Sequence, residues 1–245
     1  MLCNFRATQL LNLISKLGEI VSGRGLEITF RDRVGAASVL SSMLKGEIKA
    51  RKKDHQGQIL ILGIPRGGIV VADVVAQKLN ADFDIVIPRK LRAPDNEENS
   101  IGAIMQDGSV YLDALKLKWL KVSPEYVERE KAEQLREIVH RAALYRPDNQ
   151  EYNITDRTVI LVDDGVASGA TLIPAARWIR KHQPKQLIIA APVASEQAEE
   201  LLKKEADQLK FIITPSNLIT INQFYRNFEP VTEQQVIDIL KKWQS

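Results

Sequence analysis

Hydrophobic positions along the chain change period several times, and each period predicts a different element. Between residues 31 and 44, apolar residues recur every three or four positions, which predicts a helix. Its expected inner face consists of Val34, Ala37, Leu40, Ser41 and Leu44. We expect Gly46 to end this helix. The same spacing over residues 8–21 predicts an earlier helix, which Gly23 and Gly25 close.

Short apolar runs, of which the one at 59–64 is wholly apolar, alternate with further helical patterns. Runs of this kind are expected of central strands that helices cover on both faces. Strands are predicted at 59–64, 84–88, 158–163 and 186–191, and an edge strand at 210–213. Helices are predicted at 69–79, 171–182, 195–205 and 232–243. This alternation predicts an α/β fold with a Rossmann-like parallel sheet flanked by helices.

Two stretches interrupt the alternation. Residues 89–112 are polar, carry an acidic turn and do not resemble core, so we predict a long flexible loop shaped as a β-ribbon. Ser123 and Pro124 then form a good helix start. That helix should reach Tyr145, which makes residues 113–150 a helical insertion.

The length of 245 residues allows one large domain with appended pieces. We expect a helical extension at 1–28 and a main domain at 29–245, with an irregular segment at 214–230. A domain of this size buries a core without disulfide or metal staples. The one cysteine, Cys3, excludes a disulfide framework and a CxxC-type metal or redox site.

The charge balance narrows the range of partners only slightly. Lys and Arg number 34 and Asp and Glu 31, a net charge of +3, which is too even to favour nucleic acid as a partner. No apolar run reaches about 18 residues, so we expect no membrane span. The N-terminal residues lack the pattern of a secretory signal, so we expect a cytoplasmic protein.

The residues richest in chemistry follow the strand predicted at 158–163. Asp163 and Asp164 come at its carboxyl end, and a small-residue loop leads directly into a helix. Loop amides and a helix N-terminus make an anion site, whereas carboxylates repel phosphate and suit sugar hydroxyls. The stretch therefore predicts a ribose site beside a 5′-phosphate site. The phosphate site comprises Gly165, Val166, Ala167, Ser168, Gly169, Ala170 and Thr171.

Residues 159–171 resemble the signature of the type I phosphoribosyltransferases. That signature is an apolar strand, two acids, two mostly apolar residues, a small or hydroxyl-bearing pair, Gly, any residue, and Ser or Thr. The resemblance implies that Asp163 and Asp164 bind the ribose hydroxyls of phosphoribosyl pyrophosphate (PRPP). It also implies Mg²⁺ as cofactor, which bridges pyrophosphate oxygens and sugar hydroxyls, so that both acids contact the metal indirectly.

More closely, residues 29–241 resemble the poorly characterised "predicted phosphoribosyltransferase" family. The segments that carry this resemblance are FRDRVGAASVL, GIPRGGIVVA, PRKLRAP…IGAI, VILVDDGVASGAT, IAAPVA and FYRNFEPVTEQQVIDIL. The resemblance implies a Rossmann-like core with a small hood, to which we assign residues 214–230. Phe224 and Tyr225 in the hood are expected to stack on an acceptor ring, and ordinary hood core is the alternative interpretation.

Two further segments match parts of the family's site. The family has a short pyrophosphate loop at a strand-to-helix turn, and this chain has Pro65, Arg66, Gly67 and Gly68 at such a turn. Residues 89–112 correspond to the flexible catalytic loop, where Arg89, Lys90 and Arg92 would stabilise the departing pyrophosphate. A simple tight turn and a solvated basic loop are the respective alternatives.

The resemblance implies phosphoribosyl transfer from PRPP to an unidentified small-molecule acceptor, expected to be a nitrogenous base, with release of pyrophosphate. Hypoxanthine-guanine enzymes carry an acid where this chain has Ala167, so their acid/base mechanism is not expected here. Other interpretations stay open: a non-catalytic PRPP-binding regulator, action on another phosphorylated sugar, a response-regulator receiver, or a plain strand–turn–helix. The oligomeric state is open too, with a homodimer as one option.

Overall fold

The structure is a computed structural model that describes residues 29–49, 59–94, 96–146 and 153–243. The expected extension at 1–28, with its helix at 8–21, lies outside the described residues. None of the helices in the described ranges has the length and hydropathy needed to cross a membrane.

A five-stranded parallel sheet forms the centre of the molecule. Its strands lie in the order β2-β1-β6-β7-β8, which places β8 at an edge, as predicted. The strands are β1 (Ile59–Gly63), β2 (Asp82–Ile85), β6 (Thr158–Val162), β7 (Gln186–Val193) and β8 (Gln208–Ile213). The strand expected at 84–88 lies earlier, because the segment that pairs with β1 is 82–85.

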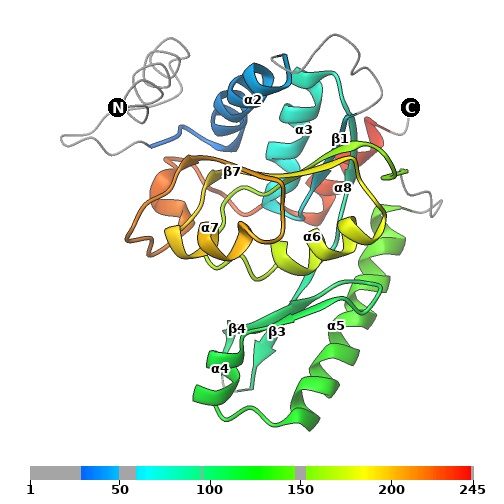
Figure 1. Ribbon diagram of the computed structural model, residues 1–245, viewed down its shortest axis with the longest axis vertical. Helices are drawn as coiled ribbons and strands as arrows, with labels where there is room; N and C mark the ends of the chain where they lie inside the picture. The colour runs from blue at the N-terminus through cyan, green and yellow to red at the C-terminus, as the bar shows by residue number, and fades with distance from the viewer. Residues whose placement is uncertain (1–28, 50–58, 95, 147–152, 244–245) are drawn as a thin grey trace.

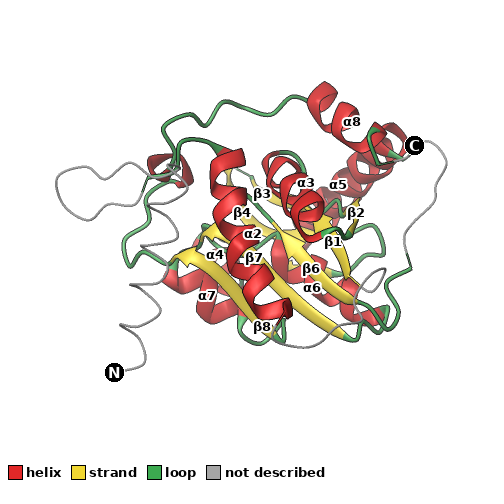
Figure 2. Cartoon of the chain, turned by 90° about the horizontal axis from the view of Figure 1, so that it is seen from above, coloured by secondary structure: helices red, strands yellow, loops and turns green. Residues whose placement is uncertain are grey.

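Helices cover both faces of this sheet (Figure 2), so the predicted α/β architecture is confirmed. One face carries α2 (Arg33–Lys49), α3 (Gly67–Leu79) and α8 (Glu233–Lys241), and the other carries α6 (Leu172–Lys181) and α7 (Glu196–Leu202). Side chains alternate between two cores: Ile61 and Ile160 pack on one side, Leu60 and Leu161 on the other. Because both faces are covered, β1 is apolar from Ile59 to Leu62 and β6 from Val159 to Val162, with no polar residue between.

Helix α2 departs from the expected pattern at two residues. It continues through Gly46 to Lys49, so Gly46 does not end it. Val34, expected on the inner face, is 45% exposed, whereas Leu40 and Leu44 are buried. Packing of the buried residues stabilises the helix enough to tolerate an exposed glycine in its last turns.

A smaller lobe projects from the core (Figure 1) and is built from the segment predicted as a flexible loop and the helical insertion. Its antiparallel sheet, β3 (Arg89–Ala93), β4 (Asn96–Ile104) and β5 (Val110–Leu112), packs on α5 (Pro124–Tyr145), with α4 (Ala114–Trp119) between them in sequence. The β-ribbon shape is confirmed. The expectation that this segment lies outside the core was wrong, because Leu91, Ile101 and Ile104 are fully buried.

Helix α5 is capped at its start and anchored at its end. The Ser123 hydroxyl accepts a hydrogen bond from the Tyr126 amide at 3.2 Å, which confirms the predicted start. Beyond its last turn, the buried Arg146 guanidinium donates to both carboxylate oxygens of Asp84, at 3.0 and 2.7 Å, and to the Ile85 carbonyl. This contact joins the lobe to β2.

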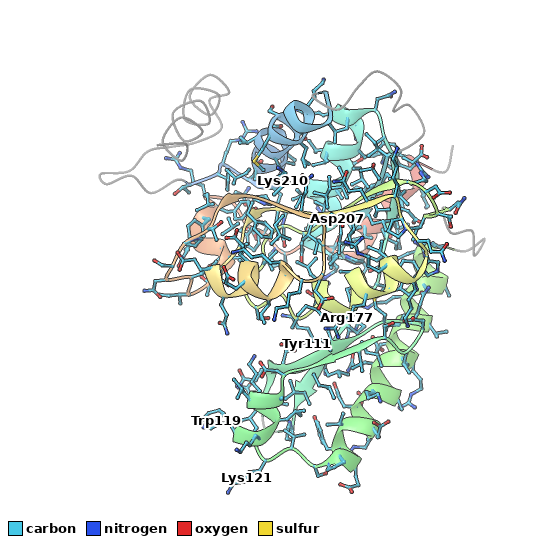
Figure 3. The ribbon with its side chains drawn as sticks, viewed as in Figure 1. Tyr111, Trp119, Lys121, Arg177, Asp207 and Lys210 are labelled. Carbon is cyan, nitrogen blue, oxygen red and sulfur yellow. The ribbon has the colours of Figure 1, made fainter. Side chains whose placement is uncertain are left out.

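A second contact joins the lobe to α6. Lys181 on α6 donates to Asp107 in the β4–β5 turn at 2.7 Å, with the lysine side chain 59% exposed. In the same region Tyr111 on β5 faces Arg177 on α6 (Figure 3), and Trp119 and Lys121 lie at the far end of the lobe. The contacts between the lobe and the core therefore include one buried and one exposed ion pair.

Candidate active site

The candidate site lies at the carboxyl ends of β1 and β6, where parallel α/β sheets bind ligands. These two strands are neighbours, with Gly63 paired to Val162, so the turns that follow them emerge side by side. The Ile64 amide donates to the Val162 carbonyl at 3.0 Å and holds the two turns together. Both turns therefore lie at one edge of the sheet.

The two turns are in close contact at the glycines. A Cβ atom added to Gly67 would lie 1.8 Å from Asp164 Oδ2, and one added to Gly68 would lie 2.8 Å from Asp163 Oδ1. Only residues without side chains fit between the turn and the two acids. The segment assigned to pyrophosphate therefore lies directly against the segment assigned to ribose.

Asp164 is held by an ion pair that sequence reasoning missed. Arg33 Nε donates to Asp164 Oδ2 at 2.7 Å, and Arg33 Nη1 donates to the Glu229 carbonyl at 2.8 Å. The guanidinium also lies 3.7 Å from the centre of the Phe228 ring. Arg33 lies within the FRDRVGAASVL segment, but nothing local in that segment indicates a partner 131 positions away.

Asp163 differs electrostatically from its neighbour. Its carboxyl is half-buried and accepts a hydrogen bond from the Asp164 amide at 2.8 Å. Burial, and next the negative charge of Asp164, raise the pKa of Asp163 well above its usual range, although the positive charge of Lys90 opposes this. The pair thus comprises one ion-paired acid and one that resists ionisation.

Tyr225 contacts the acid pair through the backbone of Asp164. Its hydroxyl donates to the Asp164 carbonyl at 2.7 Å, and its ring packs between Phe30, at 5.6 Å, and Phe228, at 4.6 Å between centroids. Burial raises the pKa of Tyr225 well above its usual range, and so does the charge of Asp164. Because the ring is enclosed, we no longer assign Tyr225 to acceptor stacking. The half-buried Phe224, in η1 (Ile221–Phe224), keeps that role as a prediction.

The loop assigned to the 5′-phosphate, 165–171, is hydrogen-bonded to the start of α7 and exposes two of its residues to solvent. Ser195 donates to the Ala167 carbonyl at 2.7 Å and holds the loop against the start of α7. Gly169 has a φ of +71°, in the left-handed region that favours glycine. Ala167 and Ser168 are exposed, and the Thr171 side chain makes no capping hydrogen bond to α6. An exposed loop with an uncapped helix start suits an anion, so the assignment of this loop to the 5′-phosphate stays a prediction.

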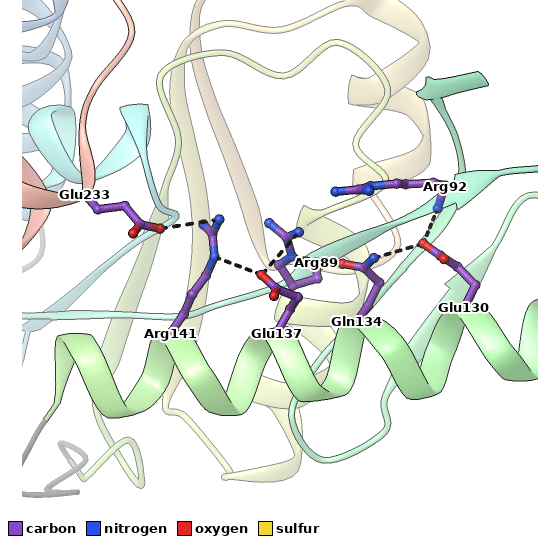
Figure 4. A network of polar contacts seen from close by, with 7 residues as sticks. All are labelled: Arg89, Arg92, Glu130, Gln134, Glu137, Arg141 and Glu233. Carbon is purple, nitrogen blue, oxygen red and sulfur yellow. Dashed lines mark hydrogen bonds and ion pairs between the residues drawn. The ribbon is translucent and has the colours of Figure 1, made fainter.

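The three basic residues of β3 divide into two groups. Lys90 is exposed, and its charge acts on Asp163. Arg89 is turned toward α5, where its Nε donates to Gln134 at 3.0 Å (Figure 4). The Arg92 amide donates to Glu130 on the same helix at 2.9 Å. Of the three expected catalytic residues, Lys90 is thus the one with a recorded electrostatic link to the acid pair.

The parallel sheet, the acid pair and the small-residue loop together define a protein of the type I phosphoribosyltransferase fold. The family model for the phosphoribosyl transferase domain matches residues 43–228. The chain therefore belongs to the phosphoribosyl transferase domain family.

Known relatives agree with this assignment. Two Mycobacterium tuberculosis proteins, named "Putative phosphoribosyl transferase" MT0597 (strain CDC 1551 / Oshkosh) and Rv0571c (strain ATCC 25618 / H37Rv), are 30% identical to the chain over 184 residues. The match covers 75% of this chain and 42% of each relative, so the chain spans less than half of their length. The crystal structure of TT1426 from Thermus thermophilus is 35% identical with a TM-score of 0.71, covering 88% of this chain and 99% of that one.

Proposed function

We propose that the protein transfers the phosphoribosyl group of PRPP to a nitrogenous-base acceptor and releases pyrophosphate. The observation that carries this proposal is the contact between the glycines of the β1 turn and the acids of the β6 turn. It joins groups suited to phosphates and groups suited to sugar hydroxyls at one edge of the sheet. PRPP has phosphates at both ends of a ribose, which matches that order.

Each segment then has one part of PRPP to bind. The amides of 165–171 and the N-terminus of α6 bind the 5′-phosphate. Asp163 and Asp164 bind the ribose hydroxyls, with Asp164 oriented by Arg33. Arg66 and the amides of Gly67 and Gly68 bind the pyrophosphate.

The chemistry requires little beyond positioning and charge. The bond between C1′ and the pyrophosphate oxygen breaks, and its electron pair leaves with pyrophosphate. A ring nitrogen of the acceptor forms the new bond to C1′ and then loses its proton. Lys90, across from the acid pair, stabilises the negative charge that develops on the leaving group. An acceptor ring would meet Phe224 in the segment 214–230.

Magnesium fits this site as an ion that arrives with the substrate. Among the residues that the structure describes, no three His, Cys, Asp or Glu side chains are grouped to hold a metal ion. Mg²⁺ usually keeps several waters and relies on substrate phosphates, and Asp163 and Asp164 would contact it indirectly. Such an ion would offset pyrophosphate charge, while the residues of the chain orient the ribose.

Two measurements test the proposal. Calorimetry should detect PRPP binding to the wild-type chain, and the double variant Asp163→Asn, Asp164→Asn should lose it without loss of the circular-dichroism signal. A panel of purine, pyrimidine and related bases should then reveal an acceptor that triggers pyrophosphate release. Tight PRPP binding with no release for any acceptor would instead indicate a regulator, and unchanged affinity in the double variant would overturn the site.

A further inference from the structure

One face of α5 carries a polar stripe that the proposed reaction does not yet use. Its members recur at intervals of three and four residues, the spacing that aligns side chains along a helix. The stripe consists of Glu130, Gln134, Glu137, Arg141 and Tyr145. Figure 4 shows its first four members lying on the side of α5 that meets β3 and α8.

Two arginines, Arg89 and Arg141, share one acid of this stripe, Glu137, at long ion-pair distances. Glu137 Oε2 lies 4.0 Å from Arg89 Nη2 and 3.9 Å from Arg141 Nε, both beyond hydrogen-bond distance. Glu233 of α8 lies 3.5 Å from Arg141 Nη2. Each arginine side chain is 19% exposed, so few donors can turn to solvent instead.

Two polar atoms at the C-terminal end of the stripe are buried without a hydrogen-bond partner among the described residues. Tyr145 is 2% exposed, and no described residue forms a hydrogen bond with its hydroxyl. Arg141 Nε is also buried, and no described residue accepts a hydrogen bond from it. Buried polar groups are normally paired, so an unpaired donor next to a guanidinium requires an explanation. A ligand with acceptor oxygens would pair both atoms.

The charges around Tyr145 specify the kind of ligand. Positive charges of Arg141, Arg66 and Arg89 act on the Tyr145 hydroxyl, against one acid, Glu233. Burial lowers the pKa of Arg89, and the positive charge of Arg141 lowers it further. The negative charges of Glu137 and Glu130 oppose this lowering, so the cations are partly offset, and an anion would pair the donors that remain. This place also lies near the turn that contacts the acid pair, because Gly63, just before that turn, pairs with Ile85, whose carbonyl accepts a hydrogen bond from Arg146, the residue after Tyr145.

We propose that Arg141 and Tyr145 bind the pyrophosphate end of PRPP together with Arg66. This inference rests on the proposed function and adds two residues of α5 to the pyrophosphate site. Pyrophosphate suits the cluster because it carries several negative charges and many acceptor oxygens. The Arg141 fork can donate to two of them, and the Tyr145 hydroxyl can donate to a third.

Tyr145→Phe is the decisive variant because it removes one oxygen and keeps the ring. It should weaken binding of Mg²⁺-pyrophosphate and of PRPP about tenfold, the usual effect of losing a hydrogen bond to a charged group. It should leave the affinity for ribose 5-phosphate unchanged, since that ligand lacks pyrophosphate. Without a ligand its melting temperature should equal or exceed the wild-type value, because a buried unpaired hydroxyl is removed.

Arg141→Gln should weaken the same two ligands and spare ribose 5-phosphate. The matched control is Arg136→Gln on the exposed part of α5, which should change no affinity. Calorimetry with inorganic pyrophosphate, PRPP and ribose 5-phosphate gives all of these readouts.

The possible outcomes distinguish failure of this inference from failure of the proposed phosphoribosyl transfer. Wild-type binding of PRPP with unchanged pyrophosphate affinity in Tyr145→Phe overturns the inference and leaves the function in place. Equal weakening of ribose 5-phosphate binding also overturns it, because the effect would then be general. A wild-type chain that binds neither PRPP nor ribose 5-phosphate overturns both.

Discussion

Arg33 and Asp164 stand 131 positions apart in the chain and meet at 2.7 Å, with 11% and 16% of their side chains exposed. The guanidinium also covers the Phe228 ring and binds the Glu229 carbonyl. One residue at the start of α2 therefore connects the acid pair to the segment 214–230. This arrangement predicts that Arg33 is a positioning residue, which would act on the substrate through Asp164.

Arg33→Gln should destabilise the fold and weaken PRPP binding. Removing one partner of a largely buried pair leaves the other charge uncompensated, which costs about 3 kcal/mol. Urea unfolding measures the first effect and calorimetry the second. The control is Arg31→Gln, whose ion pair with Asp32 is exposed and should contribute less than about 0.5 kcal/mol. Equal stability of the two variants would contradict the role given to Arg33.

Asp163 should make stability depend on pH in a defined direction. Its raised pKa means that the folded state holds the proton more tightly than the unfolded state. Stability from this group is therefore complete below about pH 4, the ordinary range of aspartate, and declines as pH rises toward the raised pKa. Asp163→Asn has no proton to lose, so its unfolding free energy relative to that of the wild type should increase as the pH rises from about 4 toward the raised pKa. Urea unfolding from pH 4 to 8 should show the divergence, and parallel profiles would contradict it.

Two glycine substitutions should have opposite effects. Gly67→Ala would push a methyl group into Asp164, so it should destabilise the chain by about 1–3 kcal/mol and abolish PRPP binding. Gly46→Ala meets no atom within 4 Å in an exposed helical turn and should stabilise by about 0.5–1 kcal/mol without affecting binding. Thermal unfolding and PRPP titration of both variants check the contrast, and a tolerated Gly67→Ala would refute the contact between the two turns.

Lys90→Ala should lower the turnover number more than the affinity for PRPP. A cation that stabilises charge only as pyrophosphate leaves contributes to the transition state, and its loss costs about 100-fold in rate. Steady-state kinetics with the identified acceptor, alongside calorimetry, separate the two quantities. Lys118→Ala, on the exposed surface of α4, is the control. Matched losses in rate and affinity would reduce Lys90 to a simple binding residue.

Local patterns predicted the sheet and the acid motif because both depend on residues close together in sequence. Short apolar runs identified β1, β6 and β7, and the residues after β6 carried a recognisable motif. The role of Arg33 and the enclosure of Tyr225 depend on distant partners and left no periodic signal. Gly46 misled for a related reason, since distant packing of α2 outweighs a local helix breaker.

The same limit explains the lobe. The polar surface of 89–112 suggested a segment without core, but its few apolar side chains are buried by α5, which follows in the chain. The spacing of charges along α5 does not by itself distinguish a face in solvent from one that packs on a neighbouring strand. Only the packing of β3 against α5 gives Arg89 and Gln134 their partnership.

The two attachments of the lobe respond differently to ionic strength. The pair between Lys181 and Asp107 is largely exposed, so added salt screens it, whereas the buried pair between Arg146 and Asp84 is shielded from the ions of the solvent. Concentrated salt therefore weakens the contact between the lobe and α6 and spares the contact between the lobe and β2. Leu91, Ile101 and Ile104 belong to the same apolar cluster as the core, so packing that salt does not screen still holds β3, and Lys90 with it, against the core.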